Sequence, residues 1–203
     1  MRFSSPIFAL FLSGALSLAP APVLLLADDS PRPSSAQKIS VPGVRNAGKV
    51  SEHLFRGAQP SLSELHQLKN LGITTIIDLR AESSGTAEVE QKRAESLGIK
   101  FLRIPIGGFS NPTDSELAHY FQVLRDSPAQ TFFVHCEFGR DRTGVMIAAY
   151  RIAFENWSAE QALSEMMDFG FNRLWHPSMI TFVRNLPNRL QSSSELQKAL
   201  KPN

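Results

Sequence analysis

The sequence predicts an α/β fold with a mostly parallel central sheet of four to five strands flanked by helices. Strand-like and helix-like segments alternate along the chain, as they do in βαβ units. The stretch ITTIIDL at 73–79 is apolar and β-branched, which indicates a strand buried on both faces. With 203 residues and a hydrophobic fraction of 42%, the chain is long enough for one globular domain plus appendages.

Four short runs rich in β-branched and aromatic residues are expected to form the strands. They cover residues 54–56, 73–79, 100–106 and 131–135.

Six segments are expected to form helices. Capping-box spacing starts three of them, at Ser61 with Glu64, Thr113 with Glu116 and Ser158 with Gln161. Pro177 is suited to the first turn of the last helix. The expected helices cover residues 61–72, 86–97, 113–126, 142–155, 158–168 and 177–190.

The first 27 residues have the layout of a signal peptide, with one arginine before an apolar run. An uncleaved N-terminal anchor is the alternative, although Pro20 and Pro22 interrupt the run. Residues 28–48 are rich in Pro, Ser and Gly and are predicted to be a linker. The main folded domain is then expected at 49–192 and a C-terminal tail at 193–203. This layout predicts a periplasmic or secreted protein that touches a membrane only through an uncleaved N-terminal segment.

The net charge is +2, which is too small to predict nucleic-acid binding from overall electrostatics. A bound anion therefore needs a local site, and no nucleic-acid partner is expected.

Cys136, in VHCEFGRDRTG at 134–144, is the one cysteine of the sequence. Exported proteins usually contain disulfides, but a single cysteine cannot form one within the chain. Cys136 is therefore either a buried, inert side chain or a reactive group.

The predicted elements place Cys136 at the carboxyl end of a strand, just before a helix. Ligands bind at this edge in open α/β sheets, and the N-terminus of a helix attracts anions. Gly139 allows a tight turn, so that consecutive N–H groups face one point and Arg142 closes the site on a phosphate. The residues expected to bind phosphate are Glu137, Phe138, Gly139, Arg140, Asp141 and Arg142.

The same surroundings favour a thiolate at Cys136, which is the nucleophilic form of the side chain. Thr143 can donate its hydroxyl hydrogen to the sulfur when the sulfur leaves. His135 is expected to orient the loop through backbone contacts rather than to act as a base.

HCEFGRDRTG fits the His-Cys-x5-Arg-Thr signature of cysteine-dependent protein tyrosine phosphatases. LFRGAQPS, LKNLGITTIIDLR and RIPIGGFSNPTDSEL also resemble the bacterial dual-specificity phosphatase family, which has periplasmic members and atypical plant and fungal relatives. The resemblance covers roughly residues 48–190. It implies a compact protein tyrosine phosphatase-like fold and a cysteinyl-phosphate intermediate, with no metal and no cofactor.

The resemblance also implies a general acid from the loop between the third strand and the next helix. The only aspartate in that loop is Asp114, which otherwise is a first-turn acid that favours the helix dipole. The alternative acid is Asp141, because Cys-x-x-Gly-x-Asp-Arg resembles the loop of some lipid phosphatases. In a purely structural role, Asp141 is a partner of Arg140 or a local helix cap.

Three further features have two interpretations each. Arg140 either recognises substrates with several phosphates or is a solvated side chain. Arg80 is expected to pair with Asp78 or Glu82, with substrate contact as the alternative. The aromatic residues of 168–179 are expected in the core, with a wall for an aromatic substrate as the alternative.

The leading hypothesis is an exported phosphatase that hydrolyses phosphotyrosine, with phosphoserine and phosphothreonine as further substrates. Its partner is a phosphorylated protein or a small phosphomonoester. The alternatives are an inositol phosphate or phosphoinositide phosphatase and a catalytically dead phosphate-binding module. A thiol redox protein is disfavoured because the sequence has no second, resolving cysteine.

Overall fold

The computed structural model describes Met1 and residues 34–81 and 85–202. The chain divides into two compact units, Met1–Arg32 and Pro33–Asn203, and the fold described below is that of the second. The predicted signal peptide or anchor lies outside the described residues, apart from Met1. Within the described ranges, none of the helices combines the length and the apolar character that a membrane span requires.

The domain is built on a six-stranded sheet in the order β1-β2-β3-β6-β4-β5. Strands β3, β6, β4 and β5 are parallel, whereas β1 and β2 pair in antiparallel fashion at one edge. The mostly parallel sheet of the predicted α/β class is confirmed, with the β1–β2 pair added to the four expected strands. The strands are β1 (Gln37–Lys38), β2 (Gly48–Lys49), β3 (Leu54–Ala58), β4 (Thr75–Arg80), β5 (Lys100–Ile106) and β6 (Phe132–Cys136).

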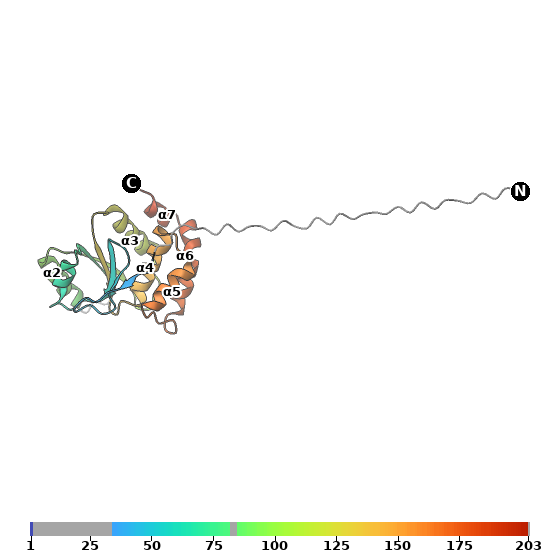
Figure 1. The fold of residues 1–203 in the computed structure, drawn as a ribbon. Coiled ribbons are helices and arrows are strands. Elements are labelled where there is room, and N and C mark those ends of the chain that lie inside the picture. Colours follow the sequence, from blue (N-terminus) through green and yellow to red (C-terminus); the bar gives the residue numbers. More distant parts are fainter. Residues whose placement is uncertain (2–33, 82–84, 203) are drawn as a thin grey trace. The chain divides into compact units, whose positions relative to one another are not determined.

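Helices cover both faces of the sheet, with α2 on one side and α3 to α7 on the other (Figure 1). The capping boxes at Thr113 and Ser158 are confirmed, and so is Pro177 in the first turn of α6. The helices are α1 (Leu65–Asn70), α2 (Thr86–Ser96), α3 (Asp114–Asp126), α4 (Asp141–Phe154), α5 (Ala159–Asp168), α6 (Pro177–Ser192) and α7 (Ser194–Leu200).

The capping box predicted at Ser61 is wrong. Helix α1 begins only at Leu65, and Glu64 precedes it without a side-chain cap. The amide of Ser61 donates to the carbonyl of Gly43, and the amide of Glu64 donates to the carbonyl of Ser61, so that these residues form a turn. A contact distant in sequence therefore overrides the local helix signal.

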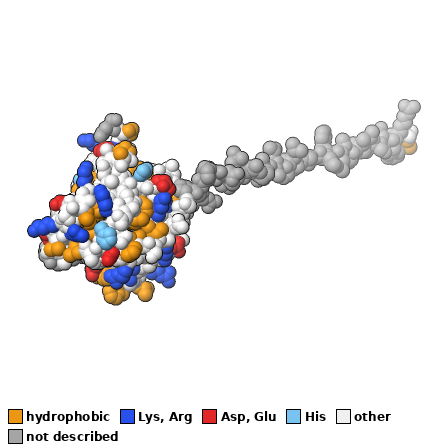
Figure 2. Space-filling view, turned by 60° about the vertical axis from the view of Figure 1, so that its left-hand side comes forward, with side chains coloured by type: hydrophobic (Ala, Val, Ile, Leu, Met, Phe, Trp, Pro, Cys, Tyr) orange, Lys and Arg blue, Asp and Glu red, His pale blue; other side chains and the backbone are white. Residues whose placement is uncertain are grey.

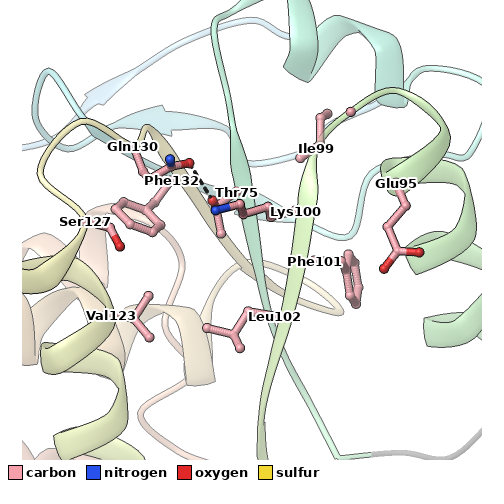
Figure 3. Close-up of a pocket in the computed structure, with 11 residues that line it drawn as sticks. Thr75, Glu95, Ile99, Lys100, Phe101, Leu102, Val123, Ser127, Gln130 and Phe132 are labelled. Carbon is pink, nitrogen blue, oxygen red and sulfur yellow. Dashed lines mark hydrogen bonds between the residues drawn. The ribbon is translucent and has the colours of Figure 1, made fainter.

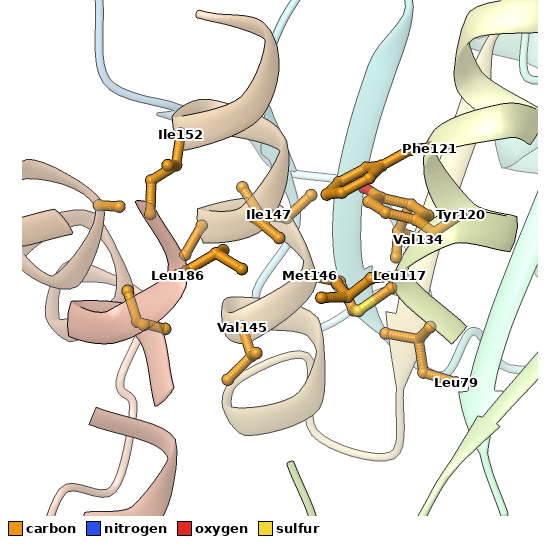
Figure 4. Close-up of a cluster of buried hydrophobic side chains, with 14 of the residues drawn as sticks. Leu79, Leu117, Tyr120, Phe121, Val134, Val145, Met146, Ile147, Ile152 and Leu186 are labelled. Atoms are coloured by element: carbon orange, nitrogen blue, oxygen red, sulfur yellow. The ribbon is translucent and has the colours of Figure 1, made fainter. Parts of the chain in front are cut away.

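Alternate residues of the central strands face two separate cores. Ile77 and Val134 belong to the larger cluster with α3, α4 and α6, part of which is drawn in Figure 4. Ile76 and Phe133 belong to a smaller cluster with α1 and α2. Side chains alternate across a strand, so burial of both faces requires the continuous apolar runs that the sequence shows.

The linker predicted at 28–48 is wrong for residues 34–48, which are part of the domain; residues 28–33 lie outside the described residues. This N-terminal segment contains β1 and β2 and buries Val41, Val44 and Ala47 in the smaller core. Its apolar residues are separated by Pro and Gly and lack a helix or strand period. Tertiary packing buries them although no local pattern predicts it.

The tail predicted at 193–203 is also wrong in its described part, because it contains helix α7. Leu196 and Ala199 are fully buried in the larger core. Arg125 on α3 donates a hydrogen bond of 2.6 Å to the carbonyl of Ala199. The folded domain therefore extends beyond the predicted boundary at residue 192.

Candidate active site

Cys136 is the last residue of β6, and helix α4 begins five residues later at Asp141. The strand lies between β3 and β4, so the connecting loop emerges between the carboxyl ends of parallel strands. Cys136 itself is only 3% exposed. The predicted strand–loop–helix arrangement is thus present, and it places the thiol at the edge of the sheet where ligands bind.

Gly139 turns the loop back onto β3. Its φ of +66° is in the left-handed region, and a Cβ at this position would lie 2.3 Å from the carbonyl carbon of Gly57. That separation is far below any real van der Waals contact. The loop can therefore follow this path only with glycine at position 139.

Two carbonyl groups of the loop point toward β3 and the N-terminal segment. The carbonyl of Glu137 accepts from the amide of Gln59 at 3.3 Å, and the carbonyl of Gly139 accepts from Asn46 and Arg56. No peptide bond in the described ranges is cis. In a trans peptide the N–H is opposite to the C=O, so the next two amides, of Phe138 and Arg140, point away from β3. This orientation is the one that a cradle of N–H groups requires.

Arg142 occupies the first turn of α4 and is 6% exposed. Its guanidinium donates a hydrogen bond of 3.3 Å to the carbonyl of Ile106, the last residue of β5. Strands β5 and β6 are separated by β4, so Arg142 spans the carboxyl ends of the parallel strands. Thr143 beside it is fully buried, and its hydroxyl has no hydrogen-bond partner among the described residues.

His135 is a buried support of the loop. Its Nδ1 lies 3.3 Å from the carbonyl oxygen of Cys136, and its Nε2 lies 3.1 Å from Oε1 of Glu90. The expected backbone contact of His135 is confirmed by this geometry.

Arg80 forms a buried ion cluster behind the loop. It donates to both carboxylate oxygens of Asp78 at 2.8 and 2.9 Å, and to Glu90 at 2.7 Å. Burial raises the pKa of Asp78, but the hydrogen bonds from Arg80 and the nearby positive charge outweigh it and lower the pKa below its usual value. The ion pair predicted between Arg80 and Asp78 is confirmed, and Glu82 lies outside the described residues.

Asp114 is the first residue of α3, and its carboxylate accepts a hydrogen bond of 2.5 Å from Nε of Arg189. Burial raises the pKa of Asp114, but hydrogen bonds from Arg189 and Ser193 and the charge of Arg189 lower it below the ordinary value. A carboxyl held in its ionised form is poorly suited to donate a proton.

Asp141 has different surroundings. Its Oδ1 accepts from the amide of Asn172 at 2.9 Å, and its Oδ2 lies 3.8 Å from Nε2 of His176. His176 packs against the ring of Phe109, on the loop between β5 and α3, with the ring centroids 5.0 Å apart. The Arg140 guanidinium lies 5.0 Å from the ring of Phe138.

The segment 168–179 contributes to the core and to the surface. Phe169 and Phe171 are buried, as expected, whereas Leu174 and Trp175 are 83% and 69% exposed. A cavity of about 500 Å³ lies between this segment and the loop, with Arg140 and Arg173 in its wall.

Sequence reasoning missed Asn46, Arg56 and His176 as neighbours of the loop. Arg56 lies within LFRGAQPS, which the sequence marks only as part of the family resemblance. Asn46 lies in the supposed linker, although its φ of +53° marks an unusual backbone position. None of the three is close to Cys136 in sequence.

A second cavity, of about 580 Å³, lies at the opposite edge of the sheet (Figure 3). Its lining includes Thr75, Lys100 and Phe132, which are the first residues of three parallel strands. Cys136 is at the other end of β6, so this cavity is separate from the thiol. On the face drawn in Figure 2, basic and acidic side chains are interspersed, in keeping with the small net charge.

In a comparison with known families, residues 41–179 match a model described as "DSP-PTPase phosphatase fused to NAD+ Kinase". The dual specificity protein phosphatase TpbA of Pseudomonas aeruginosa is 28% identical over 133 residues, which are 62% of this chain and 55% of that protein. Inositol diphosphatase DSP4 of Arabidopsis thaliana is 27% identical over 128 residues, which are 61% of this chain and 63% of that protein. The chain spans about half the length of TpbA and somewhat more of DSP4.

Solved structures show the same fold. The crystal structure of P. aeruginosa TpbA superposes with a TM-score of 0.63 at 23% identity, covering 79% of this chain and 98% of that chain. A TpbA variant with serine in place of a cysteine, in complex with pTyr, has the same TM-score at 21% identity, covering 79% and 98%. The family model covers more than half of the sequence and contains the whole cysteine loop, so the chain belongs to the DSP-PTPase phosphatase family.

Proposed function

We propose that this protein hydrolyses phosphotyrosine monoesters through a cysteinyl-phosphate intermediate on Cys136, with phosphoserine and phosphothreonine as further substrates. The observation that supports this most is the loop 137–140, whose Glu137 and Gly139 carbonyls are tied down on the β3 side. The opposite side is left to N–H donors, at the N-terminus of α4. The relatives named dual specificity phosphatase and the TpbA complex with pTyr support the choice of substrate.

In the first step the thiolate of Cys136 attacks phosphorus, and the bond from phosphorus to the ester oxygen breaks. The leaving oxygen takes a proton from a general acid. Arg142 and the N–H groups of 137–142 hold the three remaining phosphoryl oxygens, whose charge is stabilised by these fixed donors.

In the second step water attacks the cysteinyl phosphate, and the deprotonated acid now takes a proton from that water. The sulfur–phosphorus bond breaks, inorganic phosphate is released and the thiolate returns. The buried hydroxyl of Thr143, with no partner among the described residues, is available to donate to the departing sulfur.

Asp141 is proposed as the general acid in place of Asp114. Asp114 is bound to Arg189, with its pKa lowered, so it remains ionised. Asp141 is the first residue of α4, directly after the cysteine loop, and its carboxylate lies 3.8 Å from His176 rather than against an arginine. Asp141 is also the alternative general acid that the pattern Cys-x-x-Gly-x-Asp-Arg indicates.

A second candidate function is hydrolysis of inositol phosphates or phosphoinositides. Arg140 and Arg173 line the cavity beside the loop, where they can bind a second phosphate. The relatives include inositol diphosphatase DSP4 of Arabidopsis thaliana and a protein of Rattus norvegicus named phosphatidylglycerophosphatase and protein-tyrosine phosphatase 1.

A kinetic panel tests the proposal. Phosphotyrosine peptides and inositol phosphates are compared by kcat/KM for the full chain, with Cys136→Ser as the control. We expect the highest kcat/KM for phosphotyrosine and no turnover by the serine variant. Preference for inositol phosphates assigns the second function, and turnover by Cys136→Ser rejects the nucleophile.

Residues 1–27 are proposed to direct export, on the basis of the apolar run after Arg2. Expression of the full chain in a Gram-negative host, followed by fractionation and N-terminal mass determination, tests this. A periplasmic product shortened near residue 27 is expected. Full-length protein in the cytosolic fraction contradicts export.

A further inference from the structure

We propose that Asn46 and Arg56 are positioning residues of the phosphate-binding loop, which hold the Gly139 carbonyl so that the N–H of Arg140 faces the bound phosphate. The inference rests on the proposed function of the loop. It adds two residues that lie 90 and 80 positions before Cys136 and form no described hydrogen bond with Cys136 or Arg142, although the charge of Arg56 interacts electrostatically with Cys136.

The carbonyl oxygen of Gly139 accepts two hydrogen bonds of equal length. Nδ2 of Asn46 and Nη2 of Arg56 each lie 2.9 Å from it. Nδ2 of Asn46 also donates to the carbonyl of Phe169 at 2.9 Å, so both amide hydrogens of Asn46 have acceptors. Two donors on one carbonyl oxygen fill both of its lone pairs.

The Arg56 side chain is enclosed by the protein in this position. It is fully buried on β3, and its guanidinium lies 4.0 Å from the centroid of the Phe169 ring. Burial lowers the pKa of Arg56 to about 10. Its Nε and Nη1 have no hydrogen-bond partner among the described residues, which makes burial of this charge costly. An apolar side chain would satisfy packing at position 56. Donation to the Gly139 carbonyl requires a hydrogen-bond donor, which arginine supplies.

The effect of these two hydrogen bonds on phosphate binding follows from the geometry of one peptide unit. The carbonyl of Gly139 and the N–H of Arg140 belong to the same trans peptide and point in opposite directions. Without the two donors this unit can rotate, because glycine places no Cβ in its way. A rotated peptide would turn a carbonyl oxygen toward the phosphate and replace an attraction with a repulsion.

Asn46 also connects the N-terminal segment to the loop. It lies between the buried Val44 and strand β2, in a backbone conformation with φ of +53°. The connection between β1 and β2 therefore supplies one of the two donors that orient the loop. This contact gives the segment before β3 a role in phosphate binding.

The test compares Asn46→Asp, Arg56→Met and Arg56→Lys in the full chain. Aspartate has the shape of asparagine, but its ionised carboxylate cannot donate to a carbonyl and is repelled by the two carbonyl oxygens that Asn46 contacts. We expect Asn46→Asp and Arg56→Met each to weaken competitive inhibition by vanadate and inorganic phosphate by about tenfold to a thousandfold, with kcat/KM falling in parallel. Arg56→Lys keeps a donor and is expected to recover part of the loss.

Arg151→Met is the matched control. Arg151 is also buried, lies 4.4 Å from the centroid of the Trp157 ring and donates to Glu165, but none of its described hydrogen bonds goes to the loop. This variant is expected to lower the melting temperature and leave the inhibition constants unchanged. All assays are run at least about 15 °C below the lowest melting temperature, so that every variant is folded when it is measured.

The inference is overturned if folded Asn46→Asp and Arg56→Met bind vanadate and phosphate within twofold of the unmodified chain. If that chain hydrolyses phosphomonoesters normally in the same experiment, the proposed function stands. If the unmodified chain neither binds these anions nor hydrolyses the esters, both proposals fall together.

Discussion

At the scale of single residues, the path of the loop depends on glycine at position 139, because any other residue would place a Cβ against β3. Asn46 and Arg56 hold the Gly139 carbonyl from one side, and the backbone of Gly57 and Ala58 lies against its α-carbon. The path of the loop is therefore determined by close contact with β3 as well as by its own sequence. Small changes here are expected to act on phosphate binding before they act on the fold.

Gly139→Ala is expected to lower kcat/KM by about a hundredfold or more, because the added methyl displaces the loop from β3 and misdirects its donors. Gly72→Ala is the control, since Gly72 also has positive φ, of +82°, but a Cβ added there would have nothing within 4 Å. That control should cost only about 1–2 kcal/mol of stability. Steady-state kinetics and thermal unfolding measure the two effects. Equal activity of both variants contradicts the packing argument.

Asp141→Asn is expected to lower kcat about a hundredfold to ten-thousandfold on phenyl phosphate and far less on an activated aryl ester. A poor leaving group needs the proton, whereas a good one leaves without it. Asp114→Asn should leave this dependence on the leaving group unchanged, because its carboxylate pairs with Arg189. The slope of log kcat against leaving-group basicity distinguishes the two residues. A steeper slope for the Asp114 variant alone would reverse the assignment.

At the scale of secondary-structure elements, the ends of β4 and β6 are joined to α2 by buried charges. Arg80 bridges Asp78 and Glu90, while His135 lies between Glu90 and the carbonyl of Cys136. Each charge has an opposite charge or a hydrogen bond, which offsets part of the cost of burial. The cluster keeps the strand end that contains Cys136 in register with its neighbours.

Asp78→Asn is expected to lower the free energy of unfolding by about 3–5 kcal/mol at pH 7, because it leaves Arg80 buried without its main partner. The folded-state pKa of Asp78 lies below the unfolded value of 3.8, so its stabilisation is present above pH 3.8 and is lost as the pH falls through the folded pKa. The difference in the free energy of unfolding between the unmodified chain and Asp78→Asn should therefore become smaller below pH 3.8. Urea unfolding at pH 7, 5 and 3 measures it. A difference that is the same at all three values would contradict the ion-pair account.

At the scale of the whole domain, two segments outside the expected boundaries complete the fold. The N-terminal segment supplies β1, β2 and Asn46, and α7 seals the larger core with Leu196 and Ala199. The cysteine loop thus receives support from both a region before the central strands and a core closed by the last helix.

Removal of residues 1–48 is expected to lower both the melting temperature and the affinity for vanadate, because Val41, Val44 and Ala47 leave the smaller core and Asn46 leaves the loop. Removal of residues 1–33 keeps all of these contacts and should leave both quantities unchanged. Thermal unfolding and inhibition assays compare the two truncated proteins. Equal melting temperatures and equal vanadate affinities of the two truncated proteins would support the prediction that residues 34–48 are a linker.

Much of the fold could be predicted because its signals are local. The apolar run of β4, the capping boxes at Thr113 and Ser158 and the helix after Cys136 each follow from neighbouring residues. The box at Ser61 failed because a hydrogen bond to Gly43 competes with it. The burial of Val41 and Leu196 could not be predicted, since their patterns have no period and depend on distant partners.

The fold class, the position of Cys136 at the end of a strand and the family could be predicted from the sequence, because they depend on the order of side chains within short stretches. The folded chain was needed to find where the domain begins and ends, which carboxylate pairs with an arginine and which groups hold the loop. Those outcomes depend on contacts between residues far apart in the chain, such as Asn46 with Gly139 and Asp114 with Arg189. Burial and hydrogen bonding between distant residues exist only once the chain has folded.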